Sequence, residues 1–334
     1  MRILVTGAAG FIGNEVSRIL LEAGETVYGL DNLNDYYEVS LKEARLARLK
    51  DHSRFHFAKM DIADHSALKK VYDEAAPDIV VHLAAQAGVR YSVENPHVYV
   101  EANVAGLLNL LECARARRTP HFLFASSSSV YGARDASKPF SVDDPVDHPI
   151  SLYAATKRSG ELMAHSYSHL FGLPITCLRF FTVYGPWGRP DMALFKFTSK
   201  ILRDEPIEVY NHGKHKRDFT FIDDIVSGIL LVLRGKAPSP NAAPRGPAQS
   251  TAPFRIYNIG RGQPVELMRF IEALEKSIGK KADCRYIEAQ SGDVDATWAD
   301  VSDLHRDFGY APQVSVEEGV DRFVRWYREY YAQR

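Results

Sequence analysis

The chain has 334 residues, of which 46% are hydrophobic and 25% charged. This composition is typical of a folded globular enzyme, and the length suggests about two domains. The formal net charge of −1 provides no basic field for nucleic acid. No window reaches the roughly 18 apolar residues of a membrane span. We therefore expect neither nucleic-acid binding nor membrane binding.

The three cysteines, Cys113, Cys177 and Cys284, are scattered and odd in number. They form neither a disulfide framework nor a group of metal ligands, which favours a reducing compartment and a protein without a bound metal. Because the chain also opens directly on a strand and a glycine-rich turn, we expect it to act in the cytoplasm.

The first half of the chain alternates short apolar runs with stretches of helical periodicity. The runs that predict strands cover residues 2–6, 26–30, 55–60, 78–84, 122–125 and 175–180. Such alternation predicts an α/β fold in which helices cover both faces of a parallel sheet. Residues 235–254 are rich in Pro, Ala and Ser, and we expect them to form a surface loop.

Three glycines follow the first predicted strand and open a helix in VTGAAGFIGNEV. Gly7, Gly10 and Gly13 allow a tight turn, a close approach of the backbone to a pyrophosphate, and close packing of helix on strand. The N-terminus of that helix then faces the anion. We therefore predict a dinucleotide site, with Phe11 and Ile12 in the same turn, and a Rossmann-type doubly wound sheet.

Acidic residues end the second and third predicted strands. Asp31 is placed to accept hydrogen bonds from the adenosine ribose and to repel a 2′-phosphate, which favours NAD over NADP. Asp61 has the corresponding position after the third strand. It either approaches the adenine or caps the helix that follows. We also assign to the cofactor site Asn32, Ile62 and Leu83.

Tyr153 and Lys157 lie at the start of a predicted helix, at a spacing that projects both side chains from one face. Alone, this spacing favours a purely structural interpretation, in which the tyrosine belongs to the core and the lysine is solvated, because the pattern often occurs by chance. Beside an NAD site it gains a chemical meaning, because a tyrosine with its ordinary pKa of about 10 is a poor base. A nearby ammonium and the positive nicotinamide ring favour the phenolate and lower that pKa, which suits a general base.

Four consecutive serines, Ser126 to Ser129, follow an apolar run that predicts a buried strand. A serine run is often a solvated turn. At the C-terminal end of a parallel strand, however, its hydroxyls face the edge of the sheet where ligands bind. The neighbouring dinucleotide and tyrosine motifs favour this second interpretation.

With G-x-x-G-x-x-G, a strand-end hydroxyl and Y-x-x-x-K in this order, the chain resembles the extended short-chain dehydrogenase/reductases. The resemblance covers essentially the whole chain, through LRFFTVYGPWGRPDMALFKF, KRDFTFIDDI and GDVDATWAD. Within this group the sequence is most similar to nucleotide-sugar 4-epimerases, and closest to those acting on UDP-glucuronic acid. The stretches DNLNDYY, HLAAQAGVRYS and GPWGRPDMALF carry that closer similarity.

The resemblance implies a reaction and a cofactor. In such epimerases a tyrosine takes the proton of the sugar 4-hydroxyl, carbon-4 gives a hydride to NAD, the 4-keto sugar rotates, and the hydride returns to the other face. NAD stays tightly bound because each turnover regenerates it. The resemblance also implies a homodimer packed through helices near residues 98–117 and 153–171.

Roles for individual residues follow from the same resemblance. Tyr153 matches the base, Lys157 its electrostatic partner and Ser127 the catalytic hydroxyl, with Ser128 as a substrate contact. Asn103 matches an asparagine near the active site, and an ordinary place on a helix surface is the alternative.

The residues before VYG separate related reactions. Related 4,6-dehydratases carry an Asp-Glu pair there, and related UDP-glucuronate decarboxylases carry a Glu immediately before VYG. In this chain Ser128 and Ser129 occupy these positions. A hydroxyl cannot replace a carboxyl acid or base, which argues against both reactions.

A uronate substrate needs its carboxylate held, because oxidation at carbon-4 creates a β-keto acid that loses carbon dioxide readily. Thr182 and Arg189 match positions that resemble the carboxylate-binding residues of uronate epimerases, and the guanidinium fork suits this task. A surface ion pair and a diphosphate contact are the alternatives for Arg189.

Four further positions concern the nucleotide and the sugar. Arg217 matches a diphosphate-binding arginine, and Asp293 matches an acidic residue near the nucleotide ribose. Gln290 stands where glucose epimerases often keep a second diphosphate arginine. Thr297 stands where some of them carry a bulky tyrosine, so the pocket is expected to be roomier.

We therefore predict reversible 4-epimerisation of UDP-glucuronate to UDP-galacturonate. The alternatives are a UDP-glucose 4-epimerase, a UDP-glucuronate decarboxylase, a dehydrogenase that releases NADH, and a non-catalytic NAD-binding Rossmann protein. We expect an NAD-binding domain at residues 1–182, to which segments near 218–235 and 255–262 return. Residues 183–334 are expected to form a smaller mixed α/β domain that binds the nucleotide sugar.

Overall fold

The computed structural model describes residues 1–135, 137–241, 243–244, 246–288 and 294–332. Its largest element is a seven-stranded sheet in which all neighbouring strands are parallel. The strands, in order across the sheet, are β11 (Phe254–Ile259), β6 (Ile175–Phe180), β5 (His121–Ser127), β4 (Ile79–His82), β1 (Arg2–Thr6), β2 (Thr26–Asp31) and β3 (Phe55–Lys59). The predicted doubly wound α/β fold is confirmed, and all six predicted strands belong to this sheet.

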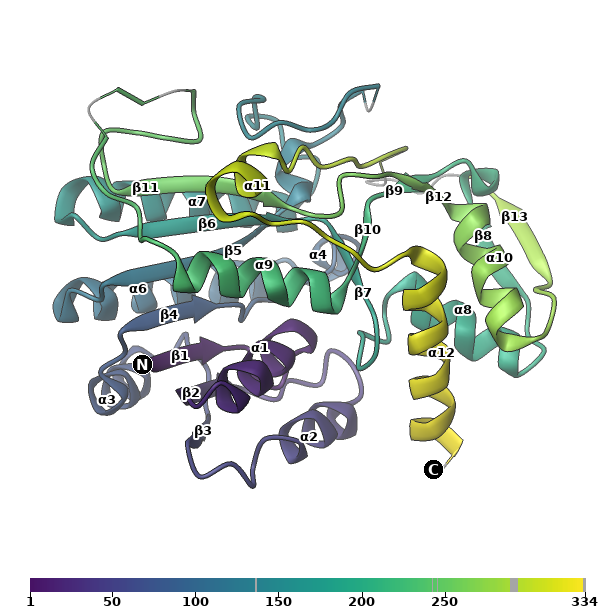
Figure 1. Ribbon diagram of the computed structural model, residues 1–334, viewed down its shortest axis with the longest axis horizontal. Coiled ribbons are helices and arrows are strands. Elements are labelled where there is room, and N and C mark those ends of the chain that lie inside the picture. The colour runs from purple at the N-terminus through teal and green to yellow at the C-terminus, as the bar shows by residue number, and fades with distance from the viewer. Residues whose placement is uncertain (136, 242, 245, 289–293, 333–334) are drawn as a thin grey trace.

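Helices cover both faces of the sheet (Figure 1). One face carries α1 (Phe11–Glu22) and α9 (Ile222–Arg234), and the other carries α3 (His65–Ala75), α6 (Gly106–Arg117) and α7 (Leu152–Phe171). Successive side chains of β1 point to opposite faces: Ile3 and Val5 pack in the core with α1 and α9, and Leu4 packs in the core on the other side. A strand buried on both faces is apolar without alternation, as the sequence of β1 is.

A smaller region lies beyond the carboxyl ends of the strands, toward which the arrowheads of β1 and β4 point (Figure 1). Its helices are α8 (Ala193–Leu202), α10 (Leu267–Ile278) and α12 (Val316–Ala332). Its strand pairs are β7 (Thr182–Tyr184) with β10 (Phe219–Phe221), β8 (Ile207–Tyr210) with β13 (Cys284–Ile287), and β9 (Lys216–Arg217) with β12 (Val265–Glu266). The remaining elements are α2 (Val39–Ala47), α4 (Tyr91–Glu94), α5 (His97–Tyr99), the π-helix η1 (Val100–Ala105), the 3₁₀ turns η2 (Ser128–Tyr131) and η3 (Asn211–Gly213), and α11 (Ser302–Phe308).

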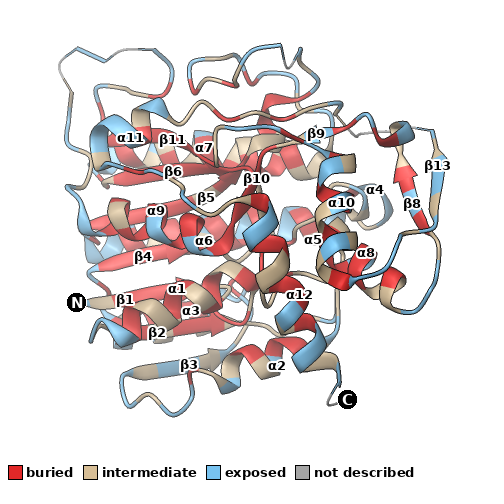
Figure 2. Cartoon of the chain, turned by 45° about the vertical axis from the view of Figure 1, so that its right-hand side comes forward, coloured by how far each residue is buried: buried red, intermediate tan, exposed pale blue. Residues whose placement is uncertain are grey.

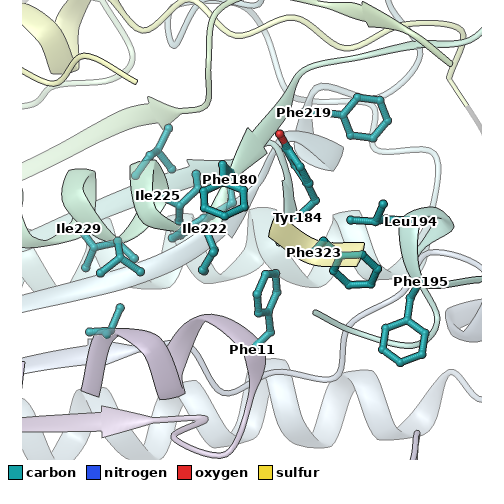
Figure 3. Packing of buried hydrophobic residues seen from close by; sticks show 14 of the residues in the cluster. Phe11, Phe180, Tyr184, Leu194, Phe195, Phe219, Ile222, Ile225, Ile229 and Phe323 are labelled. Carbon is teal, nitrogen blue, oxygen red and sulfur yellow. The ribbon is translucent and has the colours of Figure 1, made fainter. Parts of the chain in front are cut away.

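One apolar core joins the sheet to this smaller region (Figure 3). It continues from Phe11 and Phe180 beside the sheet to Phe195 and Phe323 of the smaller region. Figure 2 shows the central strands buried under their helices, whereas α10 and α12 each keep an exposed outer face. Because the sheet and the smaller region share one core, packing holds the two sides of any site between them in place.

The described residues between α9 and β11 form the expected loop, except that Phe254 already belongs to β11. Among the residues that the structure describes, no helix is long and apolar enough to cross a bilayer.

Candidate active site

The carboxyl ends of the strands and the smaller region enclose a cavity of about 720 Å³. It runs from the glycine-rich turn after β1, past the end of β5 and the start of α7, to Arg217 of β9. Every described residue that the sequence assigned to the cofactor or the substrate lines this cavity. Gln290 and Asp293 lie outside the described residues.

The glycine-rich turn leaves no room for side chains. The backbone of Gly7 has a φ of +74°, and a Cβ there would lie 2.9 Å from the amide nitrogen of Ala84. A Cβ on Gly13 would lie 2.1 Å from the carbonyl oxygen of Gly7, which accepts a 2.9 Å hydrogen bond from the Gly10 N–H. The first turn of α1 therefore opens onto the cavity without obstruction, which fits the pyrophosphate of a dinucleotide.

Asp31 is fixed at the end of β2. One carboxylate oxygen accepts the Ala9 N–H at 3.0 Å, and the other accepts the Leu33 N–H at 2.9 Å. Burial raises the pKa of Asp31, and the Leu33 N–H and the charge of Lys42 offset part of that rise. The carboxylate thus borders the glycine-rich turn, at the place expected for an adenosine ribose.

Asp61 does not cap the helix that follows it. The side chain of Asp64 accepts the Ala67 N–H at 3.0 Å and is the N-cap of α3, so the capping alternative for Asp61 is wrong. Asp61 instead accepts a 2.8 Å hydrogen bond from the Asn32 amide and lines the cavity.

The four serines are an ordered strand end and not a solvated turn. Ser126 and Ser127 are buried, and all four line the cavity. The Ser126 hydroxyl donates to Glu161 at 2.6 Å. The Ser127 hydroxyl accepts the Ser129 N–H at 3.2 Å and lies 3.2 Å from the Ser129 hydroxyl. One serine therefore anchors the strand end, and the next ones face the cavity.

A buried ion pair holds that anchor. Arg179 of β6 binds Glu161 of α7 through Nε at 2.8 Å and Nη2 at 2.9 Å. Burial alone would raise the pKa of Glu161, but the charge and hydrogen bonds of Arg179 outweigh it and keep the pKa below its ordinary value. This contribution to stability is present above the unfolded-state pKa of about 4.3 and is lost as the pH falls through the lower folded-state pKa.

Tyr153 and Ser127 line the same cavity, and the Ser127 hydroxyl is near enough to act on the pKa of the Tyr153 phenol. Burial raises the pKa of Tyr153, and the Ser127 hydrogen bond and the positive charge of Arg189 offset part of the rise. The net direction is opposite to the lowering expected from a neighbouring ammonium and a nicotinamide ring. For the complex with NAD, that lowering stays a prediction.

Lys157 is buried one turn further along α7. Its ammonium donates to the Ala125 carbonyl oxygen at 2.8 Å, and burial lowers its pKa to about 8. The positive charge of Arg189, a residue that the sequence assigns to the substrate, favours the phenolate of Tyr153.

Asn103 lies in the π-helix η1 and is buried, so a place on the helix surface is excluded. Its amide donates to the Gln86 carbonyl and to the Thr156 hydroxyl, both at 3.0 Å, and its side-chain oxygen accepts the Gln86 N–H at 2.8 Å. Asn103 thus fixes the loop after β4 against α7, beside Tyr153.

Arg189 belongs to the loop between β7 and α8. It forms an ion pair with Asp191, but this pair lines the cavity and each side chain is only about a quarter exposed. The ion pair named as an alternative therefore exists, but it belongs to the cavity wall. Thr182 at the start of β7 and Arg217 of β9 line the same cavity, as does Thr297.

Several residues of the site were not identified from the sequence. Tyr36 and Asp191 line the cavity, and Arg45 lies behind its wall. Arg45 of α2 is fully buried and donates to the carbonyl oxygens of Ala9, Trp187 and Gly188. It therefore ties the glycine-rich turn to the loop that carries Arg189. No sequence pattern indicates this link, because the partners of Arg45 are backbone groups far along the chain.

This fold and site define a dinucleotide-dependent α/β enzyme whose cavity places a tyrosine at the end of the sheet. The chain belongs to the NAD dependent epimerase/dehydratase family, which it matches over residues 3–260. The predicted family and its cofactor, NAD, are confirmed.

Individual relatives cover the chain almost completely. Protein CapI of Staphylococcus aureus is 53% identical, over 99% of this chain and 99% of its own length. A probable UDP-glucuronate 4-epimerase of Rhizobium meliloti (strain 1021) is 49% identical, over 99% of this chain and 98% of its own. The crystal structure of UDP-glucuronic acid 4-epimerase from Bacillus cereus in complex with UDP-glucuronic acid and NAD has a TM-score of 0.90 at 34% identity. It covers 99% of this chain and 100% of that one.

Proposed function

We propose that this chain is a UDP-glucuronate 4-epimerase, which interconverts UDP-glucuronate and UDP-galacturonate with tightly bound NAD. The observation that carries the proposal is the position of Arg189, whose positive charge acts on Tyr153 within one cavity. A receptor for a carboxylate then lies in the same cavity as the base. The similarity to the Rhizobium and Bacillus enzymes supports the same substrate.

The residues of the chain have distinct tasks in this reaction. NAD, when bound, accepts a hydride from carbon-4 of the sugar and returns it. Tyr153 takes the proton of the 4-hydroxyl and gives it back, and Ser127 would orient its hydroxyl. Lys157, held at the Ala125 carbonyl, would contact the nicotinamide ribose and favour the phenolate. Asp31 would bind the adenosine ribose.

Retention of the carboxylate follows from what the cavity offers. The 4-keto uronate is a β-keto acid, and it loses carbon dioxide when the breaking bond stands perpendicular to the carbonyl plane. Thr182 and Arg189 would hold the carboxylate in another orientation by directional, charge-assisted contacts. Ser128 and Ser129 line the cavity where decarboxylases and dehydratases carry carboxyl groups, so these positions supply no acid or base.

The nucleotide would lie on the smaller region. Arg217 would bind the diphosphate and Asp293 the nucleotide ribose, with Gln290 in the place of a second arginine. We propose that residues 1–182 bind NAD, with segments near 218–235 and 255–262, and that 183–334 bind the nucleotide sugar. The membership of β11 in the sheet and the packing of α9 on its face support this division.

The proposal predicts turnover without added cofactor. Purified protein given UDP-glucuronate alone should form UDP-galacturonate, which proton NMR resolves from the substrate. Formation of UDP-xylose as the main product would identify a decarboxylase. Faster turnover of UDP-glucose than of UDP-glucuronate would identify a glucose epimerase, and bound NAD without any turnover would indicate a binding protein. Each of these three outcomes contradicts the proposal.

We further propose that the chain forms a homodimer through α6 and α7, which pack beside each other. Together with η1 these helices expose the apolar side chains Val100, Leu108, Leu162, Leu170 and Phe171. Apolar side chains gathered on adjacent helices are typical of an interaction surface.

A charge introduced on these helices should separate the subunits. Sedimentation velocity is expected to give twice the chain mass of 37.5 kDa for the native protein and a single chain for Leu162→Glu. Tyr286→Glu, an equally exposed site on β13, serves as the control and should remain dimeric. A native protein that sediments as a monomer would contradict the assignment.

We also propose that the protein acts in the cytoplasm. Cys113, Cys177 and Cys284 are all free thiols, as a reducing compartment maintains them.

A further inference from the structure

Three segments that are distant in the sequence meet around Arg189. Tyr36 comes from the loop after β2, Tyr91 opens α4, and Asp191 follows Arg189 in the loop before α8. The rings of Tyr36 and Tyr91 are 4.8 Å apart, and the Tyr36 hydroxyl donates to Asp191 at 3.2 Å. These segments belong to the three stretches whose sequence is most similar to the uronate epimerases, and the fold brings them together at one point.

Asp191 is held by three donors. It accepts the Arg189 Nε–H at 3.0 Å on one oxygen, and the Nη2–H at 2.5 Å and the Tyr36 hydroxyl on the other. The backbone leaves space for this arrangement at Gly88, where φ is +101° and a Cβ would lie 2.5 Å from the Tyr36 hydroxyl oxygen. Arg189, Asp191 and Tyr36 thus form a closed group in the cavity wall, which we call the Arg189 triad.

The charges in the Arg189 triad are defined. Burial, together with the negative charge of Asp191, raises the pKa of Tyr36 to about 12, so Tyr36 is a neutral proton donor. Burial raises the pKa of Asp191, but the charge and hydrogen bonds of Arg189 outweigh it, so the carboxylate is ionised. The guanidinium is therefore already paired with a carboxylate of the protein itself.

On the basis of the proposed function, we propose that Asp191 is a specificity-determining residue that competes with the uronate carboxylate for Arg189. The competition weakens the contact between Arg189 and the substrate but keeps a directional donor in place. The reaction requires such a weak contact, because the 4-keto sugar has to rotate in the cavity between the two hydride transfers. During this rotation the sugar carboxylate must dissociate from Arg189 and bind it again. A stronger ground-state contact with Arg189 would slow the rotation.

A purely orienting role for Asp191 makes the opposite prediction. If Asp191 only aimed Arg189 at the substrate, its loss would leave the guanidinium misplaced, and the affinity for UDP-glucuronate would fall. If Asp191 competes, its loss frees the guanidinium, and the affinity rises. The sign of the change in affinity therefore distinguishes the two roles.

The experiment is a calorimetric titration of NAD-loaded protein that carries Tyr153→Phe, so that binding is measured without turnover. In this background, Asp191→Asn is expected to bind UDP-glucuronate about tenfold more tightly, which corresponds to removal of one competing charge-assisted contact. Affinity for UDP-glucose, which has no carboxylate, should change less than twofold. With Tyr153 intact, Asp191→Asn should lower kcat. Asp35→Asn is the matched control, since it removes an exposed acid from the loop that carries Tyr36.

Weaker binding or unchanged binding of UDP-glucuronate by Asp191→Asn would overturn the inference. Asp191→Ser is a second neutral variant, with the same expected direction, and circular dichroism confirms that each variant is folded. Arg189→Ala tests separately whether Arg189 binds the substrate carboxylate and whether Asp191 competes with it. It should weaken the binding of UDP-glucuronate more than that of UDP-glucose. Equal losses of affinity for the two sugars would overturn both the carboxylate assignment and the inference. A selective loss in Arg189→Ala without tighter binding in Asp191→Asn would overturn the inference alone.

Discussion

Tyr153→Phe is expected to lower kcat with UDP-glucuronate by about 10²- to 10⁴-fold, the usual contribution of a positioned general base. The substitution removes the hydroxyl of the proposed base but keeps the ring, which packs edge-on against Tyr99 at 6.2 Å. The cavity therefore retains its shape, and the NAD content per chain should not change. Initial rates by NMR and the absorbance of released NAD measure the two effects separately.

The control for this variant is Tyr286→Phe, which removes an exposed phenol from β13 and should keep the native rate. A Tyr153→Phe protein that retains more than about a tenth of the native kcat would show that another group is the base. Loss of bound NAD would instead indicate that the ring, and not the hydroxyl, supports the cofactor site.

Glu161→Gln is expected to lower the free energy of unfolding by about 3–5 kcal/mol, because it leaves the buried charge of Arg179 without its counter-ion. The Ser126 hydroxyl also loses its charged acceptor at the end of β5. Urea unfolding followed by circular dichroism measures the change.

The matched control for Glu161→Gln is Glu205→Gln. This substitution removes the same charge from an exposed ion pair with Arg203 and should cost less than about 1 kcal/mol. Equal effects of the two substitutions would mean that the Glu161 pair is not the anchor of the strand end. A drop in kcat for Glu161→Gln is also expected, since the anchored strand places Ser127.

The parts of the site that the sequence predicts are those set by local chemistry. The glycine-rich turn follows from strand, turn and helix signals within a few residues, and the spacing of Tyr153 and Lys157 places both on one helix. The serine run could be placed at the site because a strand end in a parallel sheet faces the ligand-binding edge, and the resemblance to the family then singled out Ser127.

The parts that the sequence does not predict depend on contacts between distant segments. Nothing local to Asp191 indicates that Tyr36 will donate to it, because their loops meet only in the folded chain. The same holds for Arg45, whose partners are carbonyl oxygens on two separate loops. Even within a short segment the sequence pattern leaves a choice. Asp61 and Asp64 are both acids before α3 that could cap it, and in the structure Asp64 is the N-cap.

In the serine run, a local sequence pattern and contacts between distant segments both contribute to the site. Ser126 is structural through Glu161, Ser127 reaches Tyr153, and Ser128 and Ser129 stand where related enzymes place carboxyl groups. In the proposed reaction, Ser126 and Ser127 support the base, Tyr153. Because Ser128 and Ser129 supply no acid, the 4-keto uronate rotates and is reduced.

The most direct measurement uses UDP-glucuronate that carries deuterium at carbon-4, incubated with purified protein in ordinary water without added NAD. A 4-epimerase that removes and returns the same hydride keeps the label on the same carbon. We expect UDP-galacturonate with deuterium fully retained at carbon-4, as seen by the missing proton signal at that position. Product with a proton at carbon-4, or label lost to water, would contradict the proposed reaction.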